Sequence, residues 1–409
     1  MSAALVEGGL QLNLIHLSMQ NLRHPLRLGV ASLGLASAAA AVPIDLSGAT
    51  PSIVDSETMR IDQIETLGSS YWAEFGWSKS QNNFGVNRYG QEVEYEIIDL
   101  GTLGGTNSWA TAINDHGVIV GMSQTAGDTE TAGFIFQDGV MSLVEGLGGP
   151  YSALFDINNE GVAAGMAFLE GWVGARALTF ADGVTTPLST LGGSLAASYA
   201  IASGGFVAGS SGLEGDTVQH STLWENGEIR DLGSFAELFY SVGRGVNSHG
   251  VVVGESINAT NDTIHAYVTE DGIMKNLGTF GGANAVLADI DVAGRMCGST
   301  FVNESWSHTA GKAFVVENGV ATFLGALGGG DSYACALGAN GQVVGEAEAP
   351  GDTISYAFLY EHGVMRALPS LGGSASTAGD INAHGAIVGW SSLPDDTATH
   401  AFIAIPRAR

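Results

Sequence analysis

Three aspartates have the residue type and the spacing to act together. Asp156, Asp289 and Asp380 each stand directly before the apolar residue that ends a predicted strand. Other copies of that strand carry small residues at the same position: Ala112, Ala200, Gly245 and Ala336. If these strands line a central channel, the carboxylates gather near one mouth and could hold a cation or a polar ligand. The alternative is solvated channel charge without a ligand.

A second acidic set repeats in five loops as the dipeptide Asp-Thr, at Asp128, Asp216, Asp262, Asp352 and Asp396. A ring of acids on one face could attract Ca²⁺, which makes calcium a candidate ligand. Calcium takes six to eight oxygen ligands, and one carboxylate per loop cannot supply them alone. The competing interpretation is a capped turn in which each carboxylate accepts backbone amides.

Two loops lack Asp-Thr and carry tryptophan instead. One contains Trp172, and the other, longer by three residues, contains Trp306 and His308. Insertions in repeat proteins map to loops, often on the binding face, and a tryptophan is a broad apolar platform for a sugar ring. These three residues are therefore candidate ligand-binding residues. The alternative is that each tryptophan packs onto its own repeat.

No catalytic constellation is recognisable in the sequence. It contains no His-Glu-x-x-His, Gly-x-Ser-x-Gly, P-loop or dinucleotide fingerprint. The ten histidines show no metal-ligand spacing, and His220, His265 and His400 recur because one strand recurs. We therefore predict structural histidines and assign no catalytic residue.

The frame that positions these residues is Gly-x-x-x-Gly, which occurs seven times. Its first glycines lie 44, 44, 45, 44, 47 and 44 residues apart, at Gly117, Gly161, Gly205, Gly250, Gly294, Gly341 and Gly385. A fixed period of this size indicates a repeat architecture. In the first full copy, short strands are predicted at 108–113, 118–120, 133–136 and 140–143, separated by Asn-, Gly- and Asp-Gly-containing turns.

Four short strands per repeat predict an all-β fold, a seven-bladed β-propeller of four-stranded blades. A β-helix would have shorter coils, a sandwich would not keep one period, and an α-solenoid needs apolar spacing near 3.6. The last copy lacks its fourth strand, whereas Tyr95–Leu100 precedes the first copy in the position of a fourth strand. We therefore expect 95–100 to complete the last blade and to close the ring, which leaves no exposed strand edge at the seam.

The repeats resemble the bacterial extracellular family named for its His-Ala-Phe tripeptide (HAF repeats). The resemblance rests on His400-Ala401-Phe402, Asp99-Leu100-Gly101 with the following Leu103-Gly104-Gly105, and Ile381-Asn382 with the last glycine frame. It covers about residues 95–409, although the first position of the tripeptide has drifted in other copies. The family implies export and a propeller-like fold, and it implies no established activity or catalytic residue.

The amino terminus predicts export. Arg23 and Arg27 precede an apolar run at 28–36 and small-residue cleavage patterns at 36–40, so residues 1–40 are predicted to be a signal peptide, with Met19 as a candidate true start. Residues 41–94 do not match the repeat and are predicted to be a linker and an aromatic extension. The propeller then spans 95–409.

Charge and cysteine content limit the partners. The chain carries 42 acidic against 14 basic residues, a net charge of −28, which disfavours nucleic acid and anionic membrane as partners. Cys297 and Cys335 could form one staple, but facing sheets pack too far apart for a disulfide unless the backbones converge, so two buried thiols are favoured.

Two functions remain in view. The first is a secreted, monomeric binding or scaffold module for an extracellular glycan or a surface protein. The second is a polysaccharide-acting enzyme that uses paired carboxylates. The lack of an obvious pair of convergent acids favours the first.

Overall fold

The computed structural model describes residues 83–86, 92–235, 240–258, 263–301, 311–351 and 354–407. Over these ranges the regular structure is β-strand, with three short 3-10 segments, η2 (Glu170–Trp172), η3 (Ala339–Gly341) and η4 (Pro394–Asp396), and no α-helix. The all-β prediction is confirmed. The predicted signal peptide and the aromatic residues between Tyr71 and Trp77 lie outside the described residues.

The strands follow one another in units of four. The first units are β3 (Gly104–Ile113), β4 (Ile119–Thr125), β5 (Thr131–Gln137), β6 (Val140–Leu143); β7 (Gly148–Ile157), β8 (Ala163–Leu169), β9 (Ala175–Ala181), β10 (Val184–Pro187); and β11 (Gly192–Ile201), β12 (Val207–Leu213), β13 (Gln219–Glu225), β14 (Glu228–Gly233). The next are β15 (Ser241–Val246), β16 (Val252–Asn258), β17 (Thr263–Glu270), β18 (Ile273–Gly278); β19 (Asn284–Ile290), β20 (Met296–Phe301), β21 (Gly311–Glu317), β22 (Val320–Phe323); and β23 (Ser332–Leu337), β24 (Val343–Glu348), β25 (Ser355–Glu361), β26 (Val364–Ala367). The last unit along the chain contributes β27 (Ser376–Ile381), β28 (Ile387–Ser392) and β29 (Thr399–Arg407).

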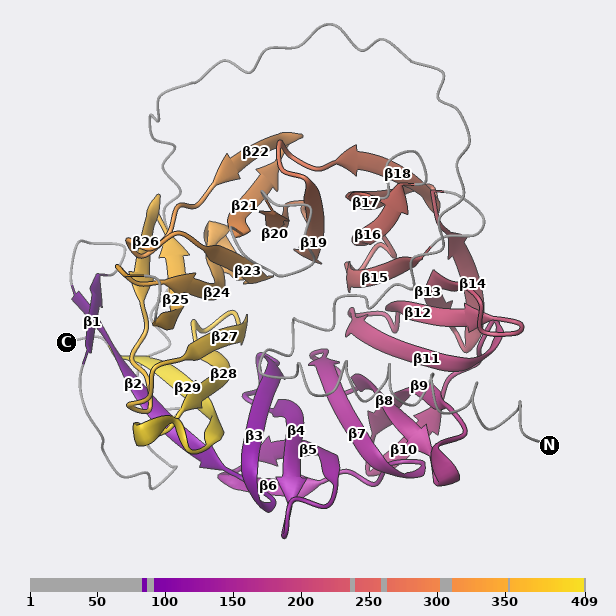
Figure 1. Cartoon of the computed structure of the whole chain (residues 1–409), viewed down its shortest axis with the longest axis horizontal. Helices are drawn as coiled ribbons and strands as arrows, with labels where there is room; N and C mark the ends of the chain where they lie inside the picture. The colour runs from indigo at the N-terminus through magenta and orange to yellow at the C-terminus, as the bar shows by residue number, and fades with distance from the viewer. Residues whose placement is uncertain are drawn as a thin grey trace, which may run out of the picture.

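Each unit is an antiparallel sheet whose strands pair in sequence order. Single parallel bridges, Thr131 with Tyr151 and Leu195 with Ala175, join the first three units into one continuous sheet. Figure 1 shows the units arranged around a centre, with β3, β7, β11, β15, β19, β23 and β27 nearest to it. The first strand of every unit therefore lies innermost.

The last unit takes its fourth strand from the other end of the repeats. β2 (Glu92–Gly101) pairs antiparallel with β29, with Ile98 opposite Ile403, and the predicted segment 95–100 lies within β2. A further strand, β1 (Asn83–Val86), pairs with β2 on its outer side. The extension expected at 41–94 thus contributes strands to this sheet.

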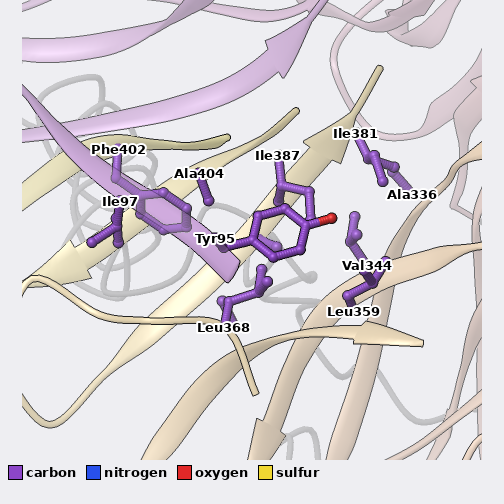
Figure 2. Close-up of a cluster of buried hydrophobic side chains, with 12 residues drawn as sticks. Tyr95, Ile97, Ala336, Val344, Leu359, Leu368, Ile381, Ile387, Phe402 and Ala404 are labelled. Atoms are coloured by element: carbon purple, nitrogen blue, oxygen red, sulfur yellow. The ribbon is translucent and has the colours of Figure 1, made fainter. Parts of the chain in front are cut away.

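Hydrophobic clusters fill the space between neighbouring units, where sheet faces pack on one another. Figure 2 shows the cluster to which β2 contributes: Tyr95 and Ile97 lie beside Ile387 and Phe402 of the last unit. Val344 and Leu359 of the preceding unit belong to the same cluster. The β2 strand is therefore held by buried side chains as well as by its ladder to β29.

The two glycines of the repeated frame meet different constraints. The first glycine closes the turn after the innermost strand with a positive φ, as at Gly250 (φ 73°) and Gly385 (φ 77°), where a side chain is disfavoured. The second has no positive φ. A Cβ on Gly254 would instead overlap the carbonyl oxygen of Val242, and the other second glycines meet an innermost-strand carbonyl in the same way.

The phenylalanine of the tripeptide packs against this second glycine. Phe134 lies opposite Gly121 across the β4–β5 ladder, and Phe402 lies opposite Gly389 across β28–β29. A Cβ on Gly121 would meet the Phe134 ring at 2.8 Å. Phe134 and Phe402 are fully buried. The phenylalanine of the tripeptide and the second glycine of the frame are therefore a cross-strand pair.

Asparagines in the first turn of the unit staple neighbouring units together. Asn114 Oδ1 accepts the amide N–H groups of His116 and Val118 within its own turn, while its Nδ2 donates to Asn158 O in the next unit, at 3.1 Å. Asn382 Nδ2 donates in the same way to Asn114 O, also at 3.1 Å. The last unit along the chain therefore contacts the first.

We expect Gly254→Val to lower the free energy of unfolding by about 1–3 kcal/mol, because the added side chain must displace the innermost strand. Gly133→Ala is the matched control: its Cβ would lie 3.3 Å from Leu154 Cγ, and five other repeats carry alanine there. Chemical denaturation of both variants measures the difference. Equal stability of the two would show that the close approach is not a constraint.

Candidate functional site

A pocket of about 180 Å³ lies at the centre, lined by residues of the seven innermost strands. Each of these strands has a break in register with the next strand, for example between Ala110 and Ala112 and between Leu287 and Asp289. The residue left unpaired at each break lines the pocket: Thr111, Phe155, Tyr199, Arg244, Ala288, Cys335 and Gly379. A β-bulge re-aims its extra side chain, which explains why these residues face the channel.

The pocket wall is asymmetric. The bulge positions Phe155, Tyr199 and Arg244, from three consecutive units, are bulky, whereas the bulge positions Ala288, Cys335 and Gly379 are small. Trp390 of β28 also lines the pocket, in the same unit as Gly379. The ring centroids of Phe155 and Tyr199 lie 5.4 Å apart at 37°. Arg244 Cζ lies 5.0 Å from the Tyr199 ring centroid, a cation–π distance.

Arg244 forms an ion pair with Glu255, a buried residue of β16. Arg244 Nη2 donates to Glu255 Oε1 at 2.7 Å, and Nε donates to both carboxylate oxygens. The Glu255 side chain is only 2% exposed, so it depends on this partner. The Glu255 carboxylate raises the pKa of Arg244 against the opposing effect of burial, and the guanidinium stays charged.

The three predicted aspartates meet in this pocket, as expected for a channel mouth. Each carboxylate bridges two units through backbone amides. Asp156 accepts from Ile157 N and from Ile201 N of the next unit, both at 2.7 Å. Asp289 binds Ile290 N (2.7 Å) and Leu337 N (2.9 Å) in the same manner.

Asp380 completes the set between the last and first units. It accepts from Ile381 N at 2.7 Å and from Ile113 N at 2.9 Å. These clamps account for the shared placement of the three aspartates before the final apolar residue of the strand. Solvated charge is therefore an incomplete description of the acids, because each also fastens two sheets.

Burial dominates the electrostatics of these acids. The residues are half-buried at the pocket wall, and the surrounding protein disfavours their charged form. Burial raises the pKa of Asp156 to about 6 and that of Asp380 to about 7, although the backbone amides oppose the shift. Repulsion from Asp289 adds to both, and burial raises the pKa of Asp289 as well.

The metal prediction gains no support from this geometry. Over the described ranges, no group of three or more His, Cys, Asp or Glu side chains is arranged to hold a metal ion. Every carboxylate oxygen of Asp156, Asp289 and Asp380 already accepts a backbone amide. Three such side chains fall well short of the six to eight oxygens that calcium takes.

Trp172 lies far from the three acids. It follows β8, whose end pairs with Gly148 at the start of β7, whereas Asp156 lies at the other end of β7. At about 3.3 Å per residue these positions are about 25 Å apart. Trp172 is 41% exposed, and its ring centroid lies 5.1 Å from that of Phe168 on its own unit. Trp306 and His308 lie outside the described residues, so their binding role stays a prediction.

The Asp-Thr loops contain capped turns where the structure describes them. Asp128 accepts from Thr106 N at 2.7 Å and from Thr106 Oγ1 at 2.6 Å, and these bonds hold its pKa below the usual value. Asp216 accepts from Ser194 N and Asp396 from Ser374 N. Asp262 and Asp352 lie outside the described residues.

Two of the recurring histidines pair with the aspartate of Asp-Leu-Gly in the fourth strand, and His265 pairs with Asn276 at the equivalent position. His400 Nδ1 lies 2.9 Å from Asp99 Oδ2, and His220 Nδ1 lies 3.0 Å from Asp231 Oδ1. Burial raises the pKa of Asp99, but hydrogen bonds from His400 and Gly101 outweigh it and leave the pKa lowered. The histidines therefore join strands, consistent with the structural role predicted for them. Cys297 and Cys335 are both free and buried, as favoured.

Sequence reasoning missed the bulge residues. The signal that could have found them is their variety: seven equivalent positions carry seven different residue types, whereas two positions later every copy has Ile, Val or Leu. Sequence reasoning also missed the ion pair of Arg244 with Glu255. This pair occurs in a single repeat, so no recurring spacing in the sequence indicates it.

No family model matches the chain, and no curated protein matches its sequence. Solved structures are similar in fold. The β-propeller domain of the Trilobed protease from Pyrococcus furiosus, described as having an open velcro topology, is 9% identical with a TM-score of 0.50 over 73% of this chain and 95% of that chain. This similarity shows the fold class alone: the chain has a β-propeller type of fold.

Two further solved structures match less well. An acylaminoacyl peptidase from Pyrococcus horikoshii is 12% identical, with a TM-score of 0.45 over 73% of this chain and 52% of that chain. A gluconolactonase from Xanthomonas campestris is 9% identical, with a TM-score of 0.41 over 81% of this chain and 99% of that chain. Within the described residues, no helix is long and apolar enough to cross a membrane.

We expect stability to fall as pH rises from about 4 to about 7. The unfolded chain releases aspartate protons near pH 4, whereas folded Asp156 and Asp380 keep theirs to about 6 and about 7. The folded state therefore binds more protons in this window, and raising pH favours unfolding until the slope vanishes above it. Thermal melting should give a higher Tm at pH 5 than at pH 8.

Asp380→Asn should remove part of the decrease in Tm between pH 5 and pH 8, because the amide does not titrate. Asp128→Asn is the control. The pKa of Asp128 is lowered, so this residue changes stability only at a pH below the range that is compared. A Tm that rises between pH 5 and pH 8 in the parent protein would contradict the assignment.

Proposed function

We propose that the chain is an exported seven-bladed β-propeller, closed by β2, that binds an extracellular ligand through its central pocket. Pairing of β2 with β29 supports the closure, as do the bonds from Ile113 N to Asp380 and from Asn382 to Asn114. The amino-terminal pattern at 1–40 and the resemblance to HAF repeats support export.

The observation that carries the binding proposal is the variety of the bulge residues. The repeats keep the same residue types wherever the sheets pack, as at the second glycine and the Ile, Val or Leu that ends the innermost strand. A position that need not serve every copy of the repeat in the same way is free to differ in every copy. At the pocket wall it does differ, from Phe155 and Tyr199 to Ala288 and Gly379, which produces one shaped, asymmetric site in an otherwise repetitive ring.

The arrangement of the three pocket aspartates suits ligand binding better than it suits catalysis. A glycosidase needs one carboxyl group to donate a proton and a second carboxylate to attack or to activate water. In the pocket, both oxygens of each aspartate hold backbone amides of two units, which fixes the carboxylates as clamps. The polysaccharide-acting enzyme is therefore the weaker alternative, and a scaffold for an extracellular glycan or surface protein is favoured.

Closure predicts that removing residues 95–100 damages the whole ring. The deletion strips Tyr95 and Ile97 from their cluster and bares the edge of β29. We expect aggregation or loss of a single cooperative unfolding transition in calorimetry. A deletion variant that melts at the parent temperature with one transition would rule out a closing role for β2.

Ligand binding is tested with protein recovered from the medium of a host that exports it. The N-terminal sequence of this mature protein also tests whether residues 1–40 are removed as a signal peptide. A glycan array and fractionated surface extracts serve as probes, and a rise in Tm reports binding to the folded state. Ala288→Leu fills the small side of the pocket and should weaken binding roughly tenfold or more.

Ala367→Leu, an equal addition on the exposed outer strand β26, is the control and should bind as the parent does. Equal binding by Ala288→Leu and the parent would place the ligand elsewhere. Failure of every probe to raise Tm or to bind would count against a binding module.

A further inference from the structure

We propose that the central pocket accepts one neutral pyranose unit, with the apolar face of the sugar against Phe155 and Tyr199 and its hydroxyls donating to the carboxylates around it. This inference rests on the proposed function and names its ligand class. It follows from the size of the pocket, its aromatic wall and the state of its hydrogen-bonding groups.

Size limits the ligand to a single ring. The cavity measures about 180 Å³, and a protein cavity of about 150 Å³ holds benzene. A six-membered ring with small substituents therefore fits, whereas two linked rings do not. A glycan would enter by its terminal unit, with the rest of the chain outside the channel.

The aromatic wall offers a surface that suits the C–H face of a sugar. Phe155 and Tyr199 lie side by side at 5.4 Å with their planes inclined by 37°, which makes a shallow apolar wall. Arg244 lies over Tyr199 and is neutralised by Glu255, so the wall does not present an uncompensated positive charge. Opposite the wall, Ala288 and Gly379 leave the volume that a ring needs.

The donors on Thr111, Thr377 and Arg244 of the wall are engaged by the protein. Thr111 Oγ1 lies within hydrogen-bond distance of Leu154 O (2.9 Å) and Val120 O (3.1 Å), and its single proton is donated between these two carbonyls. Thr377 Oγ1 donates to Glu346 Oε2 at 2.8 Å, and Arg244 donates to Glu255. A ligand that brings its own donors therefore suits this part of the wall.

The aspartates supply the acceptors. Each carboxylate oxygen of Asp156, Asp289 and Asp380 accepts one backbone amide in the structure, and a carboxylate oxygen has two lone-pair sites. Several acceptor sites thus face a cavity bounded by apolar surface. A polyol ring, which has an apolar face and a rim of hydroxyls, complements this arrangement.

The protonation state of the acids favours a hydroxyl over an ammonium group. Burial raises the pKa of Asp156 to about 6 and that of Asp380 to about 7, so part of this acid is neutral near pH 7. A protonated carboxyl donates as well as accepts. A hydroxyl can pair with either form because it also does both, whereas an ammonium group only donates.

The test compares three small ligands on the full chain by calorimetric titration and thermal shift: neutral methyl pyranosides, cyclohexanol and cyclohexylamine. Cyclohexanol keeps the ring but has one hydroxyl, and the amine carries the competing charge. Phe155→Ala removes half of the aromatic wall, and Phe155→Leu keeps much of its volume without a ring. Phe323→Ala, at an exposed phenylalanine of the outer strand β22, is the control.

We expect at least one methyl pyranoside to bind and the other two ligands to bind more weakly. Its Kd should rise roughly two- to tenfold in both Phe155 variants, the range of an aromatic contact, and stay unchanged in Phe323→Ala. Ala288→Leu should abolish the binding. Phe155→Leu keeps the comparison valid if Phe155→Ala does not fold.

Three results would overturn the inference, and the first and the third of them leave the proposed function standing. One is binding of cyclohexylamine but of no neutral pyranoside, which would assign the pocket to cations. Another is pyranoside binding that neither Phe155→Leu nor Ala288→Leu weakens, which would move the sugar site out of the channel and would also count against the central pocket as the binding site of the proposed function. Absence of binding by every pyranoside, when a surface extract still raises Tm, would also exclude a sugar.

Discussion

The structure depends on one bulge in each innermost strand. The extra residue brings a backbone carbonyl so close to the facing strand that only glycine fits opposite, as with Val242 and Gly254. The side chain of this extra residue, which is Arg244 in this unit, points toward the central pocket. A single local irregularity therefore fixes both the glycine frame of the repeat and the wall of the pocket. The phenylalanine opposite the glycine completes the arrangement by filling the space that a Cβ would have taken.

Attachment between neighbouring units is unequal. Asp156, Asp289 and Asp380 clamp three junctions, and asparagine amides reinforce others. Where the turn carries Asp291 instead of asparagine, Arg295 donates to Gly338 O of the next unit and takes over the link. Between β11 and β15, where neither clamp occurs, Arg244 lies over Tyr199 across the junction. The same side chains thus join sheets and shape the pocket, so a change at the wall alters both stability and the site.

Much of the fold could be predicted from the sequence because the repeat exposes its own rules. The period, the turn glycines and the Asp-Gly hairpins gave strands close to those observed, and the missing fourth strand of the last copy pointed to Tyr95–Leu100. The prediction that Asp156, Asp289 and Asp380 gather also followed from equivalent positions. Their role did not, because the amides they hold belong to another repeat, at Ile201, Leu337 and Ile113. A pattern within one repeat contains no information about which neighbour completes a hydrogen bond.

The acids illustrate how one arrangement serves stability and binding under opposing demands. A buried carboxylate is costly when charged, and backbone amides offset only part of that cost, which is why the pKa values of Asp156 and Asp380 stay raised. A ligand that donates hydrogen bonds to these oxygens would stabilise the charged form without new protein contacts. The clamps are therefore incompletely satisfied by the protein alone, and the donor-bearing ring that we propose as the ligand would complete them. On this argument, ligand binding and the pH dependence of stability are linked through the same three side chains.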